Sequence, residues 1–269
     1  MASGIPVELT VRNTFDAWKA AGVTLSKELV RLDAELDALR FVDTRPPGLP
    51  DVEITEANAE QVVRDRAQQL LPTLSVDARS AMERARKEIE TDRVRRALHA
   101  LAAAAPDAVD QLAPEFDAAA ARYADAVNRL PVGVTTEQIV NGGDADVLGA
   151  LNDAKRAAAD LAVFDSFVTG LSDLPGVGRM AQPPVRLIRP TTPKVFYDMA
   201  DAHQKGGRSM SGVERQLNPL WLTAARDGVE FRLQTPRESR ELVDALEDER
   251  VRSYAGTGTT PRGAAITYA

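Results

Sequence analysis

Apolar residues recur at helical spacing through the first two thirds of the chain. Five leucines are separated by four, three, four and three residues, namely Leu25, Leu29, Leu32, Leu36 and Leu39. Residues at this spacing fall on one stripe of an α-helix, and charged residues stand between them. The pattern therefore predicts an amphipathic helix, which the prolines of segment 44–50 must end because proline lacks the backbone N–H.

The same spacing predicts further helices downstream. We expect one over residues 55–71, one over 76–104 and one from about residue 107 to 130, with a kink or a fresh start at Pro114. A capping box of Thr135 and Gln138 opens a short helix, and a long helix then runs to Leu171. The alternation over residues 7–11 fits either a short strand or the start of a helix.

Apolar stripes of this kind cannot all face water. Burying one Leu or Val side chain contributes roughly 1.5–3 kcal/mol, so exposed stripes would drive association. They must pack on one another within the chain or on another chain, and connections of moderate length favour antiparallel neighbours. Residues 1–171 are therefore predicted to form a mainly α, multi-helix antiparallel bundle or coiled-coil-like body.

The composition changes at residues 172–184, a Gly- and Pro-rich stretch that we interpret as a linker. Residues 185–252 are predicted to form a small α+β module, and residues 253–269 a flexible tail. Strands are expected over 185–189, 195–197 and 229–233, the last from strict alternation of apolar and polar residues.

Two helices are predicted inside the small module from capping boxes. The first opens at Ser211 with Glu214 three residues later, bends at Pro219 and closes at Gly228. The second opens at Thr235 with Glu238 and runs to about residue 251.

Charge separates the two regions. Residues 1–171 hold 19 basic and 28 acidic side chains, whereas residues 172–269 hold 14 basic and 12 acidic ones. An acidic body argues against broad nucleic-acid binding, which needs clustered cations. An acidic helical body before a basic C-terminal segment is similar in outline to phage and capsid assembly proteins, and the arginine- and alanine-rich composition suits a GC-rich bacterium or its phage.

Cysteine is absent, which excludes disulfides, thiolate metal sites and a cysteine nucleophile. No secretory signal and no apolar run of about 20 residues is visible in the sequence, so a cytoplasmic location is expected. The two histidines, His99 and His203, have no partners at metal-binding spacing. No catalytic residues, metal or cofactor are predicted, which leans against an enzyme without deciding the matter.

The best candidate ligand site is an anion-binding loop that follows His203. Two glycines beside two cations could form a backbone nest for phosphate ahead of the helix that Ser211 opens, but the spacing does not match a P-loop. A plain surface turn is the alternative. The loop consists of Lys205, Gly206, Gly207, Arg208 and Ser209.

A second candidate is a surface of basic and aromatic residues in segment 179–215 and beyond. Candidate contact residues are Arg186, Arg189, Lys194 and Trp221, although Trp221 in NPLWLTAA also fits a core position.

The leading hypothesis for function is a non-enzymatic assembly, scaffold or adaptor protein that self-associates or binds a protein partner through helix packing and the C-terminal module. Small-molecule or phosphate binding at residues 205–209 and weak nucleic-acid association through residues 179–215 are the alternatives. No membrane partner is expected.

Overall fold

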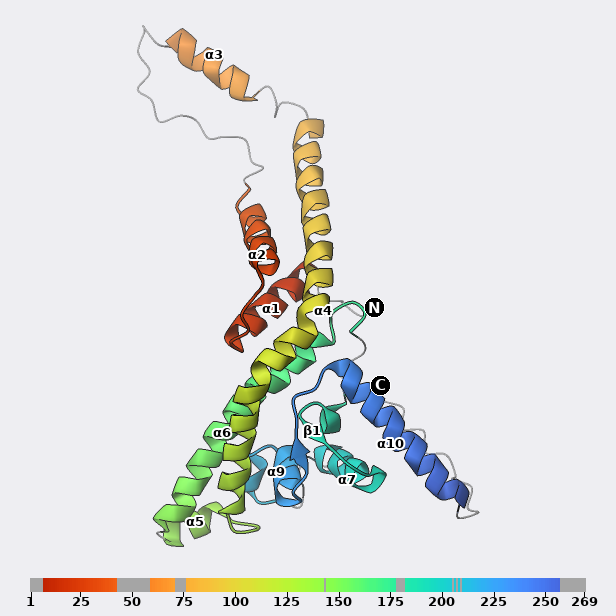
Figure 1. Cartoon of the computed structure of the whole chain (residues 1–269). Helices are drawn as coiled ribbons and strands as arrows, with labels where there is room; N and C mark the ends of the chain where they lie inside the picture. Colours follow the sequence, from red (N-terminus) through yellow and green to blue (C-terminus); the bar gives the residue numbers. More distant parts are fainter. Residues whose placement is uncertain are drawn as a thin grey trace. The chain divides into compact units, whose positions relative to one another are not determined.

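The computed structural model describes residues 7–42, 59–70, 76–142, 144–177, 182–204, 206, 208 and 210–256 (Figure 1). Within these ranges the chain is mainly α-helical with one small sheet, as the sequence predicts. It divides into two compact units. The N-terminal unit comprises Met1–Arg12 and Leu25–Ala100, and the C-terminal unit comprises Asn13–Thr24 and Leu101–Ala269.

The N-terminal unit contains α2 (Lys27–Arg40), α3 (Ala59–Leu70) and the first parts of α1 (Val7–Ala20) and α4 (Val76–Asn128). The leucine stripe of the sequence is buried on α2 at Leu29, Leu32 and Leu36. Ser26 caps α2 by accepting a hydrogen bond from the Leu29 N–H, which satisfies one donor that the first turn leaves free.

The C-terminal unit is built on a helical hairpin of α4 and α6 (Ala145–Leu171), joined through α5 (Thr136–Gly142). Arg122 of α4 pairs with Asp160 at 3.1 Å, and Arg129, the residue after α4, pairs with Asp153 at 3.0 Å. The later arginine therefore pairs with the earlier aspartate of α6. The two helices are antiparallel, as Figure 1 also shows.

Aromatic side chains fill the core of this unit, although aromatics make up only 5% of the sequence. Trp18 of α1 packs on Phe167 of α6 with ring centroids 5.8 Å apart, and Phe116 of α4 meets Phe164 edge-on at 5.4 Å. The second part of α1 therefore covers the α4–α6 hairpin. Gly22, at φ +89°, ends α1 in the left-handed conformation that glycine adopts without strain.

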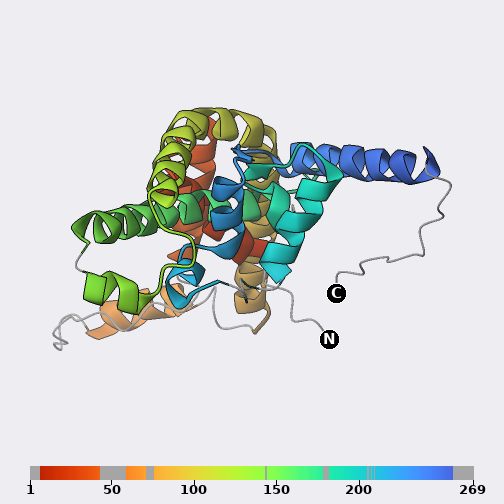
Figure 2. The same ribbon diagram turned by 90° about the horizontal axis from the view of Figure 1, so that it is seen from below.

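The rest of the C-terminal unit is a sequence of short elements. They are η2 (Pro183–Val185), β1 (Ile188–Arg189), α7 (Pro193–Gln204), α8 (Gly212–Arg215), α9 (Pro219–Arg226), β2 (Glu230–Phe231) and α10 (Pro236–Gly256). The strands pair antiparallel, with Ile188 opposite Phe231. α7 contacts both α9 and α10, and this grouping can be followed from below in Figure 2.

These short elements are anchored on α4 by one buried tyrosine. The Tyr123 ring lies edge-on to Trp221 of α9 at 6.4 Å and to Phe231 of β2 at 6.0 Å, and its hydroxyl donates to the Leu217 carbonyl. Burial raises the pKa of Tyr123 well above its ordinary value, with Arg226 opposing the change. Tyr123 therefore stays a neutral hydrogen-bond donor at the centre of the unit.

Three capping boxes predicted from the sequence are confirmed. Thr135 and Gln138, Ser211 and Glu214, and Thr235 and Glu238 each exchange reciprocal side-chain and backbone hydrogen bonds. The predicted closure at Gly228 is also confirmed, with φ at +67°. The residues 7–11, left open between strand and helix, belong to α1.

The predicted break near Pro106 and the predicted fresh start at Pro114 are wrong, because α4 runs through both prolines. The alternative, a kink at Pro114, stays a prediction. Each proline lies on the exposed side of the helix. The carbonyls that lose their donors, at Ala102 and Asp110, are on residues with solvent access, so water can replace the missing bonds. Buried neighbours such as Leu112 hold the helix together by packing on its other side.

Two further predictions are corrected in the C-terminal part. Residues 195–197 were expected as a strand but lie in α7, whose first residue is Pro193, a position that favours a helix start. Pro219 begins a new helix instead of bending one. Asn218, at φ +60°, separates α8 from α9, and its side chain caps α9 by accepting a hydrogen bond from the Leu220 N–H.

The compact units do not coincide with the predicted domains. Residues 101–171, predicted as part of the bundle, share one unit with the predicted linker and module. Most of the predicted tail, residues 257–269, lies outside the described residues. Among the described residues, no helix is long and apolar enough to cross a membrane.

Candidate functional site

α2 has a second apolar face, on the side opposite its buried leucines. Three members lie on α2 and the fourth, Phe41, is its C-cap residue. They lie four, four and three residues apart, the spacing of one helical stripe, and all are exposed: Val30, Ala34, Ala38 and Phe41. Phe41 is 82% exposed and Val30 53%. Large apolar side chains that gather on one exposed stripe mark interaction surfaces more often than single exposed residues do. We call this stripe the α2 outer face.

The other side of α2 is fixed by packing and by ion pairs within the N-terminal unit. Arg93 of α4 meets Glu35 at 2.8 Å. Arg12 of α1 donates to the Leu36 carbonyl at 3.1 Å and lies within 4.0 Å of carboxylate oxygens on Asp37 and Glu90. These contacts hold the orientation of α2, so the outer face is a fixed feature of the unit.

Other apolar side chains of the N-terminal unit are also exposed. Ile89 of α4 is 49% exposed and Ala85 is exposed one turn before it. Met82, Ala85 and Ile89 are three and four residues apart, the spacing of one helical stripe, and the side chain of Met82 lies outside the described residues. Val63 of α3 is 69% exposed. Ala85 and Ile89 are therefore left uncovered by the described parts of this unit.

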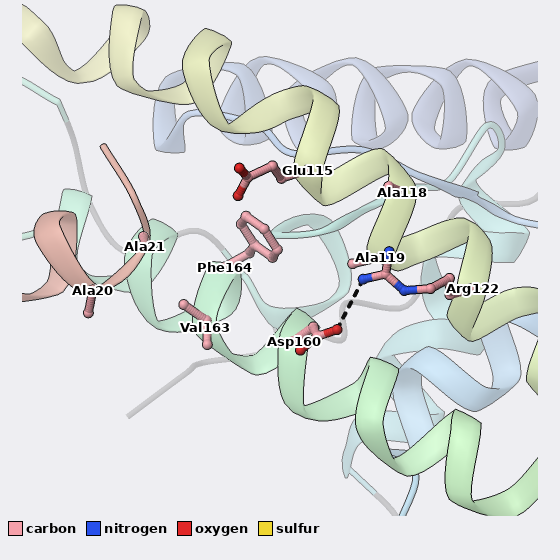
Figure 3. Close-up of a pocket in the computed structure, with 9 residues that line it drawn as sticks. All are labelled: Ala20, Ala21, Glu115, Ala118, Ala119, Arg122, Asp160, Val163 and Phe164. Atoms are coloured by element: carbon pink, nitrogen blue, oxygen red, sulfur yellow. Dashed lines mark hydrogen bonds and ion pairs between the residues drawn. The ribbon is translucent and has the colours of Figure 1, made fainter. Parts of the chain in front are cut away.

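A groove in the C-terminal unit lies between α1, α4 and α6 and encloses about 380 Å³. Figure 3 shows Phe164 and Val163 of α6 between Ala21, the residue after α1, and the Arg122–Asp160 ion pair, with the Glu115 carboxylate of α4 near the Phe164 ring. The floor is apolar and the polar groups stand at the rim.

The predicted anion-binding loop is only partly described. Gly206, at φ +55°, and Arg208 are exposed, whereas Lys205, Gly207 and Ser209 lie outside the described residues. Ser211 uses its hydroxyl to cap α8 and to donate to the Val134 carbonyl. His99 and His203 are both exposed. Over the described ranges, no group of three His, Asp or Glu side chains could hold a metal ion.

Two of the predicted contact cations are already paired within the chain. Arg186 reaches Asp165 at 3.1 Å and the Thr169 hydroxyl at 2.7 Å, and its side chain is 14% exposed. Lys194, on the surface, pairs with Asp198 at 2.8 Å, and this hydrogen bond and charge raise the pKa of Lys194. Arg189 is half-buried on β1.

Trp221 is buried, at 5% exposure. Its ring packs on Tyr123, so the structure places it in the core and not on a contact surface. The sequence NPLWLTAA is compatible with Trp221 in the core or on a contact surface, because large apolar residues after a helix-starting proline occur in both places.

Arg186 joins α6 to the segment around η2. Burial raises the pKa of Asp165, and Arg186 and His203 oppose this change. A carboxyl whose pKa is raised despite an adjacent guanidinium loses hydration that the ion pair does not fully replace. The pair therefore positions η2 on α6, and we assign it no ligand.

The most buried charged group in the described chain is Glu214, at 2% exposure. Its carboxylate accepts from the Ser211 N–H at 3.0 Å and the Gly133 N–H at 2.9 Å, and it pairs with Arg226 at 2.6 Å. Burial alone would raise the pKa of Glu214, but these hydrogen bonds and the Arg226 charge outweigh it and lower the pKa below 4.5. Glu214 thus ties α8, α9 and the turn before α5 together.

The lowered pKa of Glu214 predicts a pH dependence of stability. The unfolded chain takes up the proton near pH 4.5 while the folded chain still resists it, so the stabilisation is complete above that value and is lost as the pH falls. We expect the difference in unfolding free energy between wild type and Glu214→Gln to narrow as the pH falls through and below about 4.5. Denaturant titrations of both chains measure it, and a constant difference would contradict the expectation.

A scan of protein-family models, a search of curated proteins and a search of solved structures each found no match to this chain. The geometry of the chain itself is therefore the basis for a functional proposal.

Proposed function

We propose that the protein is a non-enzymatic assembly or adaptor protein that self-associates through the α2 outer face. The observation that carries this proposal is the exposure of Val30, Ala34, Ala38 and Phe41 on one stripe, opposite the stripe that packs within the unit. Leaving such a stripe in water forgoes roughly 1.5–3 kcal/mol for each large side chain. Pairing with a second copy would recover this free energy.

The shape of the α2 outer face suits a second copy of itself. Two alanines lie between Val30 and Phe41, so the middle of the stripe is flat and another helix can approach closely. In an antiparallel pair about a two-fold axis, Phe41 of each copy would lie against Val30 of the other. Such an interface uses one patch twice, which is the commonest way that soluble proteins form dimers.

The two alternative hypotheses are phosphate binding and nucleic-acid binding, and we do not adopt either as the proposal. Phosphate binding at residues 205–209 rests on a loop of which the structure describes only Gly206 and Arg208, both exposed. Nucleic-acid binding through residues 179–215 needs free cations, and Arg186 and Lys194 are held by carboxylates of the same chain. Both hypotheses stay predictions of the sequence.

Size-exclusion chromatography with light scattering, run at two protein concentrations, tests the proposal. We expect a mass that rises towards twice the chain mass of 29.0 kDa as concentration increases, because association follows mass action. A mass of 29.0 kDa at both concentrations would contradict self-association.

A further inference from the structure

A second groove of the C-terminal unit runs between α4 and the segment that contains β2. It encloses about 580 Å³. On the α4 side it is lined by residues about one turn apart: Pro106, Val109, Asp110, Ala113 and Asp117. On the other side four consecutive residues, 230–233, line it together with Thr235 and Glu238.

The lining by consecutive residues indicates that the groove follows the edge of β2 and of the two residues after it. A strand presents only alternate side chains on either face, so a groove over one face would not be lined by residues 230, 231, 232 and 233 alike. Among the described residues β2 has one partner strand, β1, in a two-stranded sheet, so its other edge has no strand beside it there.

The hydrogen-bond pattern determines which backbone groups point to this open edge. The Arg232 N–H donates to the Leu187 carbonyl at 2.9 Å, and Phe231 lies opposite Ile188. In an antiparallel ladder, alternate residues direct both backbone groups towards the partner strand. Glu230 and Arg232 thus face the side of β1, and Phe231, the strand residue between them, directs its N–H and C=O groups to the other edge. An unpaired strand edge of this kind is a template for another strand.

The dimensions of the groove fit a short extended peptide. From Pro106 to Asp117 the helix advances 11 residues, which is about 16 Å at 1.5 Å per residue. A strand of about five residues covers the same length at about 3.3 Å per residue. The floor between the two walls carries the apolar residues Val109, Ala113 and Leu233, which can receive alternate side chains of such a peptide.

The charge of the rim favours a cationic peptide. Four exposed carboxylates line the groove, at Asp110, Asp117, Glu230 and Glu238, against one exposed guanidinium at Arg232. The carboxylates lie on both walls of the groove. Cationic side chains of a peptide bound between the walls could therefore reach the carboxylates of either wall. Complementary charge of this kind steers association and selects the partner.

We infer that this groove binds an extended, cationic segment of a partner protein as an added β-strand beside β2. The inference deepens the adaptor function proposed above, since it names the chemistry of the partner that the C-terminal unit would recruit. It concerns a surface separate from the α2 outer face. The chain carrying Val30→Glu and Phe41→Glu should therefore bind the peptide as wild type does, whether or not wild type self-associates.

The test uses a fluorescently labelled peptide of alternating arginine and valine, six residues long, titrated with the full chain and followed by anisotropy. Two further peptides of the same sequence carry N-methyl groups on the arginines only or on the valines only. Each removes the donors of one peptide edge. Only one edge can pair with β2, so we expect one methylated peptide to bind at least about tenfold more weakly and the other to stay within about threefold.

Protein variants test the charge of the rim. Asp110→Asn combined with Asp117→Asn should weaken binding by about tenfold at low salt. Asp125→Asn, on the same helix outside the groove lining, should leave binding unchanged.

Three results would overturn the inference. They are equal binding of the two methylated peptides, undiminished binding to the Asp110 and Asp117 variant, and no binding of the unmethylated peptide at about 1 mM, the weak end of specific recognition. One-sided sensitivity to methylation together with dependence on the two aspartates would establish it.

Discussion

A chain that carries Val30→Glu and Phe41→Glu is expected to remain a 29.0 kDa monomer at concentrations where wild type associates. Association would bury both side chains, each worth roughly 1.5–3 kcal/mol, and a two-fold interface uses each of them twice. Glutamate at these positions adds the cost of removing a charge from water. Because about 1.4 kcal/mol changes an equilibrium constant tenfold, the dissociation constant should rise by at least about a hundredfold. Light scattering at matched concentrations measures the change.

Val132→Glu is the matched control for this double variant. Val132 is 85% exposed, as much as Phe41, but it lies in the turn before α5 in the C-terminal unit. It should leave the mass unchanged if association depends on the α2 outer face and not on exposed apolar residues in general. Thermal unfolding of both variants should match wild type because all three positions are exposed. A double variant that associates like wild type would remove α2 as the interface.

The leucine stripe of α2 could be predicted from the sequence, and the opposite face could have been but was not. Leu29, Leu32 and Leu36 are strongly apolar and evenly spaced, so their burial follows from the period alone. The outer face has the same period, but two of its members are alanines and charged residues stand beside them. Alanine adds little to an apolar signal, so that side of the helix was interpreted as charged and solvated.

Local signals predicted local structure well elsewhere too. Each capping box depends on residues three apart, and all three are present. The fresh start predicted at Pro114 was wrong because a proline rule describes the backbone at one residue, whereas the buried face of α4, at residues such as Phe116, is determined by α6. Residues 195–197 were likewise misassigned, since three apolar or aromatic residues fit a strand as well as a turn of helix.

The two grooves and the buried ion pairs could not be predicted from spacing. Arg186 was expected on a contact surface because the sequence shows its charge but not Asp165, which lies 21 residues earlier. The open edge of β2 depends on the pairing of residues 188 and 231, far apart in the chain. The sequence did predict Glu214 as a member of a capping box, but it did not indicate that Gly133 and Arg226 would contact its carboxylate.

Glu214→Ala is expected to destabilise the C-terminal unit more than any exposed substitution. It removes a carboxylate that the Ser211 and Gly133 N–H groups and Arg226 all contact. Arg226 is 21% exposed and would lose its partner within a largely dry site. Removing one member of a buried pair costs about 3–5 kcal/mol. For a chain of this length the midpoint of thermal unfolding should fall by roughly 6–12 °C, measured by calorimetry or circular dichroism.

Glu238→Ala provides a close control, because Glu238 occupies the same third position of a capping box and is exposed. Its hydrogen bonds to Thr235 compete with water, so its loss should cost about 1 kcal/mol or less. The two variants together separate the capping contribution, which both remove, from the buried ion pair, which only Glu214→Ala removes. Equal destabilisation by the two would mean that Arg226 and Gly133 find water once Glu214 is gone, and that the buried cluster contributes no more than an ordinary cap.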